Sequence, residues 1–166
     1  MTQPSFVHLR LHTEYSITDS VLRVDEAVRS AFEDAMPALA ITDLANMFGM
    51  VKFYKAARAA GIKPIVGCDV WITNESERDK PHRALLLAQS RKGYLLLSEL
   101  LSRAWLTNQH RGRGEISRHW FEAGTEGLIC LSGAQNGEIA AAVLQGNGDA
   151  AAKLAKTWAE LFPGRF

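Results

Sequence analysis

The sequence contains no segment that would carry it into or across a membrane. No apolar run approaches the roughly 20 residues that a membrane helix needs, and residues 1–6 have neither the basic stretch nor the apolar core of a secretory signal. Cysteine is also scarce, because only Cys68 and Cys130 occur, both in apolar, strand-like runs. We therefore expect buried free thiols in a reducing cytoplasm, and no membrane partner.

A strong charge of one sign and the common catalytic motifs are missing too. The formal net charge is +1, so the charge balance neither supports nor excludes contact with DNA through a local patch. There is no G-x-G-x-x-G or Walker pattern for phosphate binding and no G-x-S-x-G nucleophile elbow. What is present, 166 residues of which 47% are hydrophobic and 22% charged, is typical of one soluble globular domain.

Short apolar runs alternate with segments of helical periodicity. Strands are predicted at residues 6–12, 37–42, 65–72, 84–88 and 127–131, and helices at residues 25–35, 46–60, 92–107, 138–144 and 149–161. We expect Asn46 to cap the second helix, Gly61 to end it, and residues 110–114 to form a mobile loop. Because the strands lack polar alternation, the pattern favours an α/β fold with mainly parallel pairing, as a covered sheet or a barrel.

Polar side chains, several of which can bind metals, lie at the ends of several predicted strands. In α/β folds, functional groups gather at the carboxyl ends of the strands. The candidates are His8, Arg10 and His12 on the first strand, Asp19 beyond it, and then Asp43, Cys68, Asp69 and His82. Imidazole and carboxylate groups suit zinc, manganese or iron, which would activate a water for attack on a phosphoryl group.

Each candidate also has a structural alternative. A strand histidine is more often a packing residue than a ligand, and His82 beside a proline fits an ordinary loop. Asp43 could cap the turn toward Asn46. Asp69 lies in an apolar run, so it needs a partner whether its role is structural or functional. Cys68 fits an inert packing thiol.

Basic residues recur in two places. Lys52, Lys55 and Arg58 share one face of the second predicted helix and could contact a phosphate backbone, although a solvated helix face is the simpler interpretation. Arg111 and Arg113 could do the same from their glycine-rich loop, where flexibility is the simpler explanation.

Four segments carry a family resemblance. They are Phe6-Val-His-Leu-Arg-Leu-His-Thr-Glu-Tyr-Ser16, Met36-Pro-Ala-Leu-Ala-Ile-Thr-Asp43, Gly49-Met-Val-Lys-Phe-Tyr54 and Gly61-Ile-Lys-Pro-Ile-Val-Gly-Cys-Asp69. In this order and spacing they resemble the polymerase-and-histidinol-phosphatase (PHP) domain that begins the alpha (catalytic) subunits of bacterial DNA polymerase III. The resemblance implies an incomplete PHP-type distorted (β/α)7 barrel over residues 1–166. The last strand–helix units and all polymerase domains would be missing, because no strand follows the turn at residues 162–166.

The resemblance also implies where the family's metal site would lie. Matching ligand positions hold His12, Asp19, Asp69 (in place of a glutamate) and His82, whereas Arg10, Leu44 and Ala134 stand where the family has further ligands. A final Asp-x-His would lie beyond residue 166. Because each ligand offsets metal dehydration and fixes geometry, we expect this remnant site to bind metal weakly or not at all, and we expect no catalytic residue in the segment.

Arg10 suggests what could balance the charge of a former metal. We hypothesise that its guanidinium lies among Asp19, Asp43 and Asp69, since a forked cation suits carboxylates. Arg10→Ala would then leave buried carboxylates unpaired and cost on the order of 3–5 kcal/mol.

Three functions follow as alternatives. The first is a catalytically degenerate structural domain of a replicative DNA-directed DNA polymerase, a cytoplasmic bacterial nucleotidyltransferase. In the family, this domain docks the proofreading exonuclease (epsilon) subunit, whereas the parent chain binds Mg2+, primer–template DNA and the rest of the holoenzyme. The second is an active PHP phosphoesterase or 3′–5′ exonuclease with Zn2+ or Mn2+. The third is a free-standing binding module.

Overall fold

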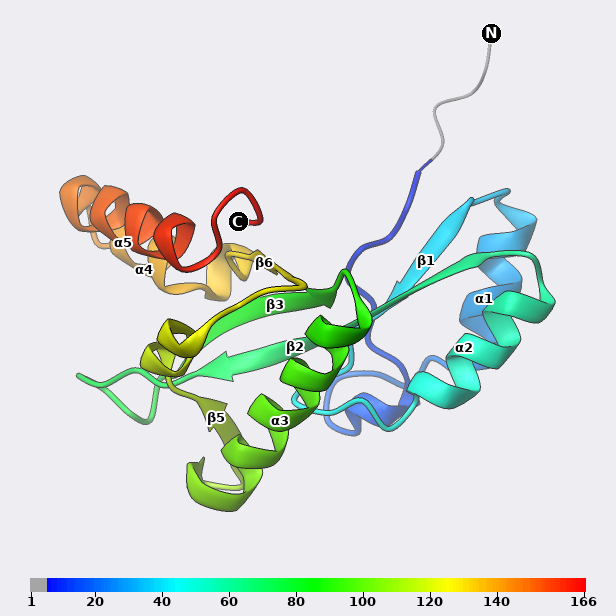
Figure 1. Cartoon of the computed structure of the whole chain (residues 1–166), viewed down its shortest axis with the longest axis horizontal. Coiled ribbons are helices and arrows are strands. Elements are labelled where there is room, and N and C mark those ends of the chain that lie inside the picture. Colours follow the sequence, from blue (N-terminus) through cyan, green and yellow to red (C-terminus); the bar gives the residue numbers. More distant parts are fainter. Residues whose placement is uncertain (1–5) are drawn as a thin grey trace, which may run out of the picture. The chain divides into compact units, whose positions relative to one another are not determined.

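The computed structural model describes residues 6–166, and the chain folds into two compact units. The first ends at Cys68 and the second begins at Asp69, inside the long strand β2 (Lys63–Ile72), which contributes to both (Figure 1). None of the helices in the described part of the chain has the length and apolar character needed to cross a membrane.

The first unit is built on a two-stranded parallel sheet with two helices. Its elements are the short 3-10 helix η1 (Glu14–Ser16), α1 (Val24–Glu33), β1 (Ala38–Ile41), α2 (Met50–Ala59) and the first part of β2. β1 pairs parallel with β2, with Ala38 opposite Lys63 and Ile41 opposite Val66. These bounds confirm the predicted helices and strands to within a few residues, with the exceptions described below.

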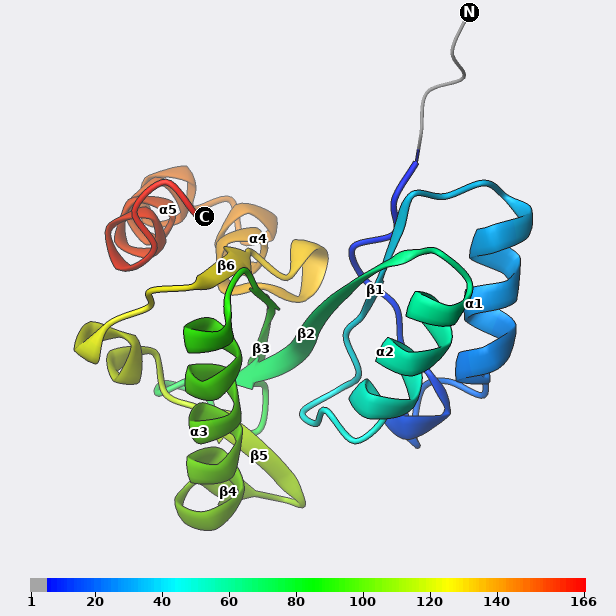
Figure 2. The ribbon, with the colours of Figure 1, turned by 45° about the vertical axis from the view of Figure 1, so that its right-hand side comes forward.

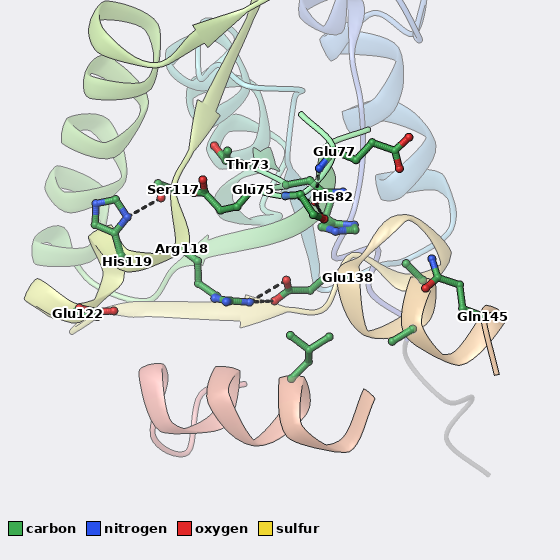
Figure 3. Close-up of a pocket in the computed structure, with 15 residues that line it drawn as sticks. Thr73, Glu75, Glu77, His82, Ser117, Arg118, His119, Glu122, Glu138 and Gln145 are labelled. Atoms are coloured by element: carbon green, nitrogen blue, oxygen red, sulfur yellow. Dashed lines mark hydrogen bonds and ion pairs between the residues drawn. The ribbon is translucent and has the colours of Figure 1, made fainter. Parts of the chain in front are cut away.

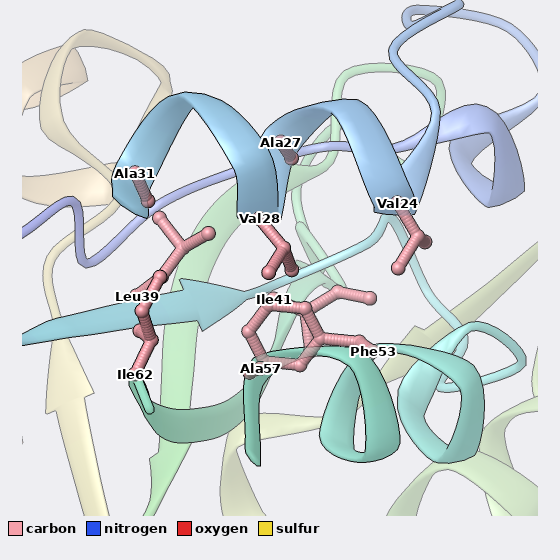
Figure 4. Close-up of a cluster of buried hydrophobic side chains, with 9 residues drawn as sticks. All are labelled: Val24, Ala27, Val28, Ala31, Leu39, Ile41, Phe53, Ala57 and Ile62. Carbon is pink, nitrogen blue, oxygen red and sulfur yellow. The ribbon is translucent and has the colours of Figure 1, made fainter. Parts of the chain in front are cut away.

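Helical spacing of apolar side chains explains why α1 and α2 form and which faces they bury. Val24, Ala27, Val28 and Ala31 of α1, Leu39 and Ile41 of β1, Phe53 and Ala57 of α2, and Ile62 make one buried cluster (Figure 4). Removing this apolar surface from water stabilises the unit at about 25 cal/mol per Å2. Gly61 ends α2 with a φ of +76°, as expected for a residue that follows a helix.

The predicted first strand is wrong, because residues 6–13 form no regular strand. The segment still runs beside β1: the Ala40 N–H donates to the His8 carbonyl at 3.0 Å and the Thr42 N–H to the Leu11 carbonyl at 2.9 Å. The three residue steps from His8 to Leu11 thus run beside only two steps of the neighbouring segment, from Ala40 to Thr42. This mismatch interrupts the ladder, as a β-bulge does.

Asn46 does not cap α2, so that prediction is also wrong. The helix begins four residues later, with Gly49 at its N-cap. The Asn46 side chain instead accepts the Phe48 N–H and donates to the carbonyls of Tyr15 and Leu44. It therefore stabilises the turn before the helix and anchors η1, which an Asx residue can do equally well.

The second unit contains a sheet of mixed direction. Its elements are the rest of β2, β3 (His82–Ala88), α3 (Arg91–Thr107), β4 (Gln109–His110), β5 (Arg113–Ile116), the 3-10 helices η2 (Arg118–Ala123) and η3 (Ala134–Asn136), β6 (Leu128–Leu131), α4 (Glu138–Leu144) and α5 (Gly148–Leu161). The strand order is β4-β5-β2-β3-β6. β2 pairs parallel with β5, but β3–β6 and β4–β5 are antiparallel. The α/β class is confirmed, whereas the pairing is mixed rather than mainly parallel.

Residues 110–114 are not the predicted mobile loop. They form the tight turn of the β4–β5 hairpin, and Arg111 and Gly112 both have positive φ, 49° and 76°. Two central residues with positive φ are the geometry of a type I′ turn, which matches the twist of a hairpin. Arg-Gly is a weaker signal for this turn than Asn-Gly, so the turn is hard to predict from sequence.

Helices and aromatic rings close the second unit. α3 packs along β3 and β5, and α4 packs against α5 (Figure 2). Near the C-terminus, Trp158 stacks on Phe162 and Phe166, with ring centroids 6.0 and 5.9 Å apart, and Phe121 meets both Trp158 and Phe162. The Cys130 N–H of β6 donates to the Arg165 carbonyl at 2.8 Å, which ties the last residues to the sheet.

Candidate functional site

Two of the predicted ligands, His12 and Asp19, meet in the first unit. His12 Nδ1 lies 3.0 Å from Asp19 Oδ2, with 13% and 39% of the two side chains exposed. Ser20 fixes the loop between them, because its hydroxyl donates to the His12 carbonyl at 2.8 Å. His8, another candidate from the same segment as His12, is exposed, and its ring contacts the ring of Phe6.

Asp43 holds the N-terminal segment rather than the turn toward Asn46. Its side chain is buried and accepts the Thr13 N–H at 2.6 Å, the Thr13 hydroxyl at 2.9 Å, and the Ser16 hydroxyl at 2.7 Å. The Ser16 hydroxyl also accepts the N–H of Leu44. Sequence reasoning missed Thr13 and Ser16, although two hydroxyl residues directly after the metal-type motif were a signal for such a partner.

Asp69 is buried in the second unit, where Arg83 is a partner. Arg83 Nε donates to Asp69 Oδ1 at 2.9 Å and Arg83 Nη2 to Oδ2 at 2.8 Å, with side-chain exposures of 9% and 2%. The guanidinium lies 4.4 Å from the centre of the Trp71 ring. β-strand alternation places Asp69 and Trp71 on the same face of β2, and Arg83 reaches them from the adjacent β3.

Two of the three carboxylates in the Arg10 hypothesis have partners elsewhere in the chain. Asp43 accepts bonds from Thr13 and Ser16, and Asp69 is paired with Arg83. The Arg10 hypothesis stays a prediction, and Arg10 itself is an exposed residue. A cost of about 3–5 kcal/mol for a broken buried pair is expected for Arg83 as well.

His82 lies in a cavity of the second unit with a volume of about 640 Å3 (Figure 3). Burial lowers the pKa of its imidazole; the charge of Arg118 acts in the same direction and that of Glu138 opposes it. Arg118 Nη1 donates to both carboxylate oxygens of Glu138, at 2.8 and 2.9 Å, and the Trp158 indole N–H donates to Glu138 as well. The cavity thus contains an imidazole whose neutral form is favoured, next to the ion pair of Arg118 and Glu138.

The remaining candidate positions have structural surroundings. Ala134 begins η3 with a φ of 47°, a left-handed conformation that follows Gly133. Cys68 and Cys130 are buried thiols, and burial raises the pKa of the Cys130 thiol. Cys68 Sγ donates to the Asp43 carbonyl at 3.1 Å, a packing role. Across residues 6–166, no three side chains of His, Cys, Asp or Glu are grouped so that they could hold a metal ion.

Comparisons with known proteins consistently indicate one family. The model of the PHP domain matches residues 8–166. The chain is 49% identical over its whole length to the DNA polymerase III subunit alpha of Neisseria meningitidis, 48% identical over 98% of its length to that of Pseudomonas aeruginosa, and 39% identical over its whole length to that of Escherichia coli. It spans only 14–15% of the length of these relatives. The match over residues 8–166 shows that the chain belongs to the PHP domain family.

Proposed function

We propose that the chain is a structural PHP domain within the alpha subunit of a bacterial replicative DNA polymerase. The observation that carries this proposal is similarity to polymerase III alpha subunits along the whole chain, at 39–49% identity. The parent protein would be a cytoplasmic DNA-directed DNA polymerase that acts in DNA replication. Its Mg2+, its primer–template DNA and the rest of the holoenzyme would be bound by other parts of the polymerase.

The donor set supports a domain without phosphoesterase activity. Arg10, Leu44 and Ala134 offer no lone pair to a metal. Asp69 has both carboxylate oxygens bonded to the guanidinium of Arg83, which is a permanent cation. A metal there would have to displace a buried cation. The residues present therefore do not fit the family's multinuclear metal site, and no step of hydrolysis is assigned to them.

We infer that this domain docks the proofreading exonuclease (epsilon) subunit. Both units have buried apolar residues, and the carboxylates that could have been ligands now hold loops and strands in place. Such preorganised surfaces suit a docking role, because binding then costs little conformational entropy.

One observation favours a second candidate, an active metal-dependent phosphoesterase or 3′–5′ exonuclease with Zn2+ or Mn2+. His12 and Asp19 remain within 3.0 Å of each other, as two ligands of one metal would. Hydrolysis assays separate the two functions. The polypeptide that carries this sequence is incubated with Mn2+ or Zn2+ and either a phosphomonoester or single-stranded DNA, next to its His12→Ala variant. We expect the wild type and the His12→Ala variant to show the same background rate. Turnover by the wild type that His12→Ala abolishes would establish the second candidate instead.

A further inference from the structure

A groove with an apolar floor lies on the second unit. It runs between α3, residues 121–126 and the end of α5, with a volume of about 650 Å3. Its floor includes Leu95, Leu96, Phe121, Leu161 and Pro163. Leu95 is 55% exposed although it is a large aliphatic side chain on a packed helix. An apolar surface of this kind is a common site of protein contact.

The rim of the groove is acidic. Glu99, Glu122 and Glu160 line it and are exposed. Within the described part of the chain, Glu99 and Glu122 make no ion pair, and Glu160 has only the distant Lys156 at 3.9 Å. Two cations also line the groove: Lys92 pairs with Glu126, and Arg165 donates to the carbonyls of Thr125 and Leu128. The four lining glutamates, Glu126 included, outnumber these two cations, so the rim presents an excess of negative charge around an apolar floor.

The walls of the groove are held rigidly. At the start of α3, Gly93 packs so closely on Gly127 that an added Cβ would lie 1.8 Å from the Gly127 carbonyl oxygen. The Thr125 hydroxyl donates to the Leu161 carbonyl at 2.6 Å, which joins residues 121–126 to the end of α5. The shape is thus formed before any partner binds, which lowers the cost of association.

We propose that this α3–α5 groove docks a protein segment that carries one or two apolar anchor residues flanked by lysine or arginine. The apolar anchors would cover Leu95 and the floor, and the cations would meet Glu99 and Glu122. The acidic rim repels the phosphates of DNA, so a nucleic acid does not fit. The inference rests on the proposed function, and the segment belongs to the exonuclease subunit that this domain docks.

The test measures the affinity of the exonuclease subunit for the polymerase subunit that carries this domain, by calorimetry or surface plasmon resonance. Two variants alter the groove: Leu95→Glu, and Glu99→Lys combined with Glu122→Lys. Two matched controls lie elsewhere: Leu106→Glu, on the same helix with 83% of its side chain exposed, and Glu33→Lys on α1. We expect each groove variant to weaken binding by about tenfold or more, equivalent to 1.4 kcal/mol, and the controls to match the wild type. Added salt should weaken the wild type more than the Glu99→Lys, Glu122→Lys variant.

Three other outcomes would overturn the inference, and each points to a different error. If the wild type binds and the groove variants bind equally well, the groove is not the docking site, while the proposed docking function stands. If the wild type does not bind at all, the docking function itself fails. If Leu95→Glu leaves binding intact but lowers the melting temperature of the isolated polymerase subunit more than Leu106→Glu does, other parts of that subunit cover the groove.

Discussion

At the scale of single residues, Arg83 is the side chain whose loss should matter most for stability. It forms two hydrogen bonds with Asp69, and both side chains are almost completely buried. A charge in this environment is stable only when it is paired, since burial removes the hydration that would otherwise compensate it. The contact with Trp71 adds packing of the guanidinium on an aromatic face.

Arg83→Ala should therefore destabilise the protein by about 3–5 kcal/mol, because it removes one partner of a buried ion pair. Lys156→Ala is the control and should cost less than about 1 kcal/mol, because its ion pair with Glu160 is exposed. Urea unfolding monitored by circular dichroism measures both values on the same protein. Equal losses for the two variants would show that the buried Arg83–Asp69 pair does not stabilise the fold.

His82 should make stability depend on pH in the acidic range. Its pKa in the folded protein lies below the ordinary 6.5, because burial disfavours the charged imidazole. The unfolded chain then binds the proton more readily, so the folded state loses stability as the pH falls through about 6.5 toward the folded pKa. This contribution is fully present above that range.

The matched comparison is His82→Asn, in which Arg118 and Glu138 are unchanged. Between pH 7.5 and pH 5.5 the wild type should lose more unfolding free energy than the variant. Identical pH profiles for the two proteins would show that the imidazole is not held in its neutral form.

How much of the site could be predicted differs from residue to residue. His12 and Asp19 were singled out by motif, and they do meet. The partner of Asp69 was not predictable, because Arg83 lies fourteen positions away on another strand and only the sheet register brings them together. The pairing of Asp43 with Thr13 and Ser16 depends likewise on how the irregular segment lies beside β1.

At the scale of elements, the contact between α3 and the turn before β6 is a tight constraint on helix placement. Gly93→Ala would place a methyl group 1.8 Å from the Gly127 carbonyl oxygen, so backbone must move. We expect a loss of about 1–3 kcal/mol or more, as for other overpacked positions. The control is Gly148→Ala at the start of α5, where a Cβ meets nothing within 4 Å.

Differential scanning calorimetry of the two glycine variants tests this claim. Gly148→Ala should leave the melting temperature unchanged or raise it slightly, because alanine loses less backbone entropy in a helix. A Gly93→Ala protein as stable as Gly148→Ala would mean that α3 can shift away from β6 at little cost.

Helices were predicted better than strands and turns. α1 and α3 have apolar residues at regular helical spacing, which depends only on local sequence. The errors at residues 6–12 and 110–114 have a different origin. The first segment is apolar enough for a strand but is interrupted by its register with β1, and the second forms a hairpin through two positive φ values that Arg-Gly does not signal.

At the scale of the whole molecule, the chain belongs to the PHP domain family, and we propose that its possible metal ligands now serve the fold. Asp43 anchors the N-terminal segment, Asp69 pairs with Arg83, and Glu138 pairs with Arg118. Carboxylates that could serve a metal are thus engaged in holding the fold. This is the physical basis for our proposal that the domain serves structure and docking rather than hydrolysis.

The most direct test of this account is the number of metal ions that the domain binds. The polypeptide is equilibrated with Zn2+ or Mn2+, desalted, and analysed by plasma mass spectrometry, with His12→Ala treated in parallel. The account predicts well below one ion per chain, with no difference between the two proteins. A value near three ions per chain, reduced by His12→Ala, would contradict it.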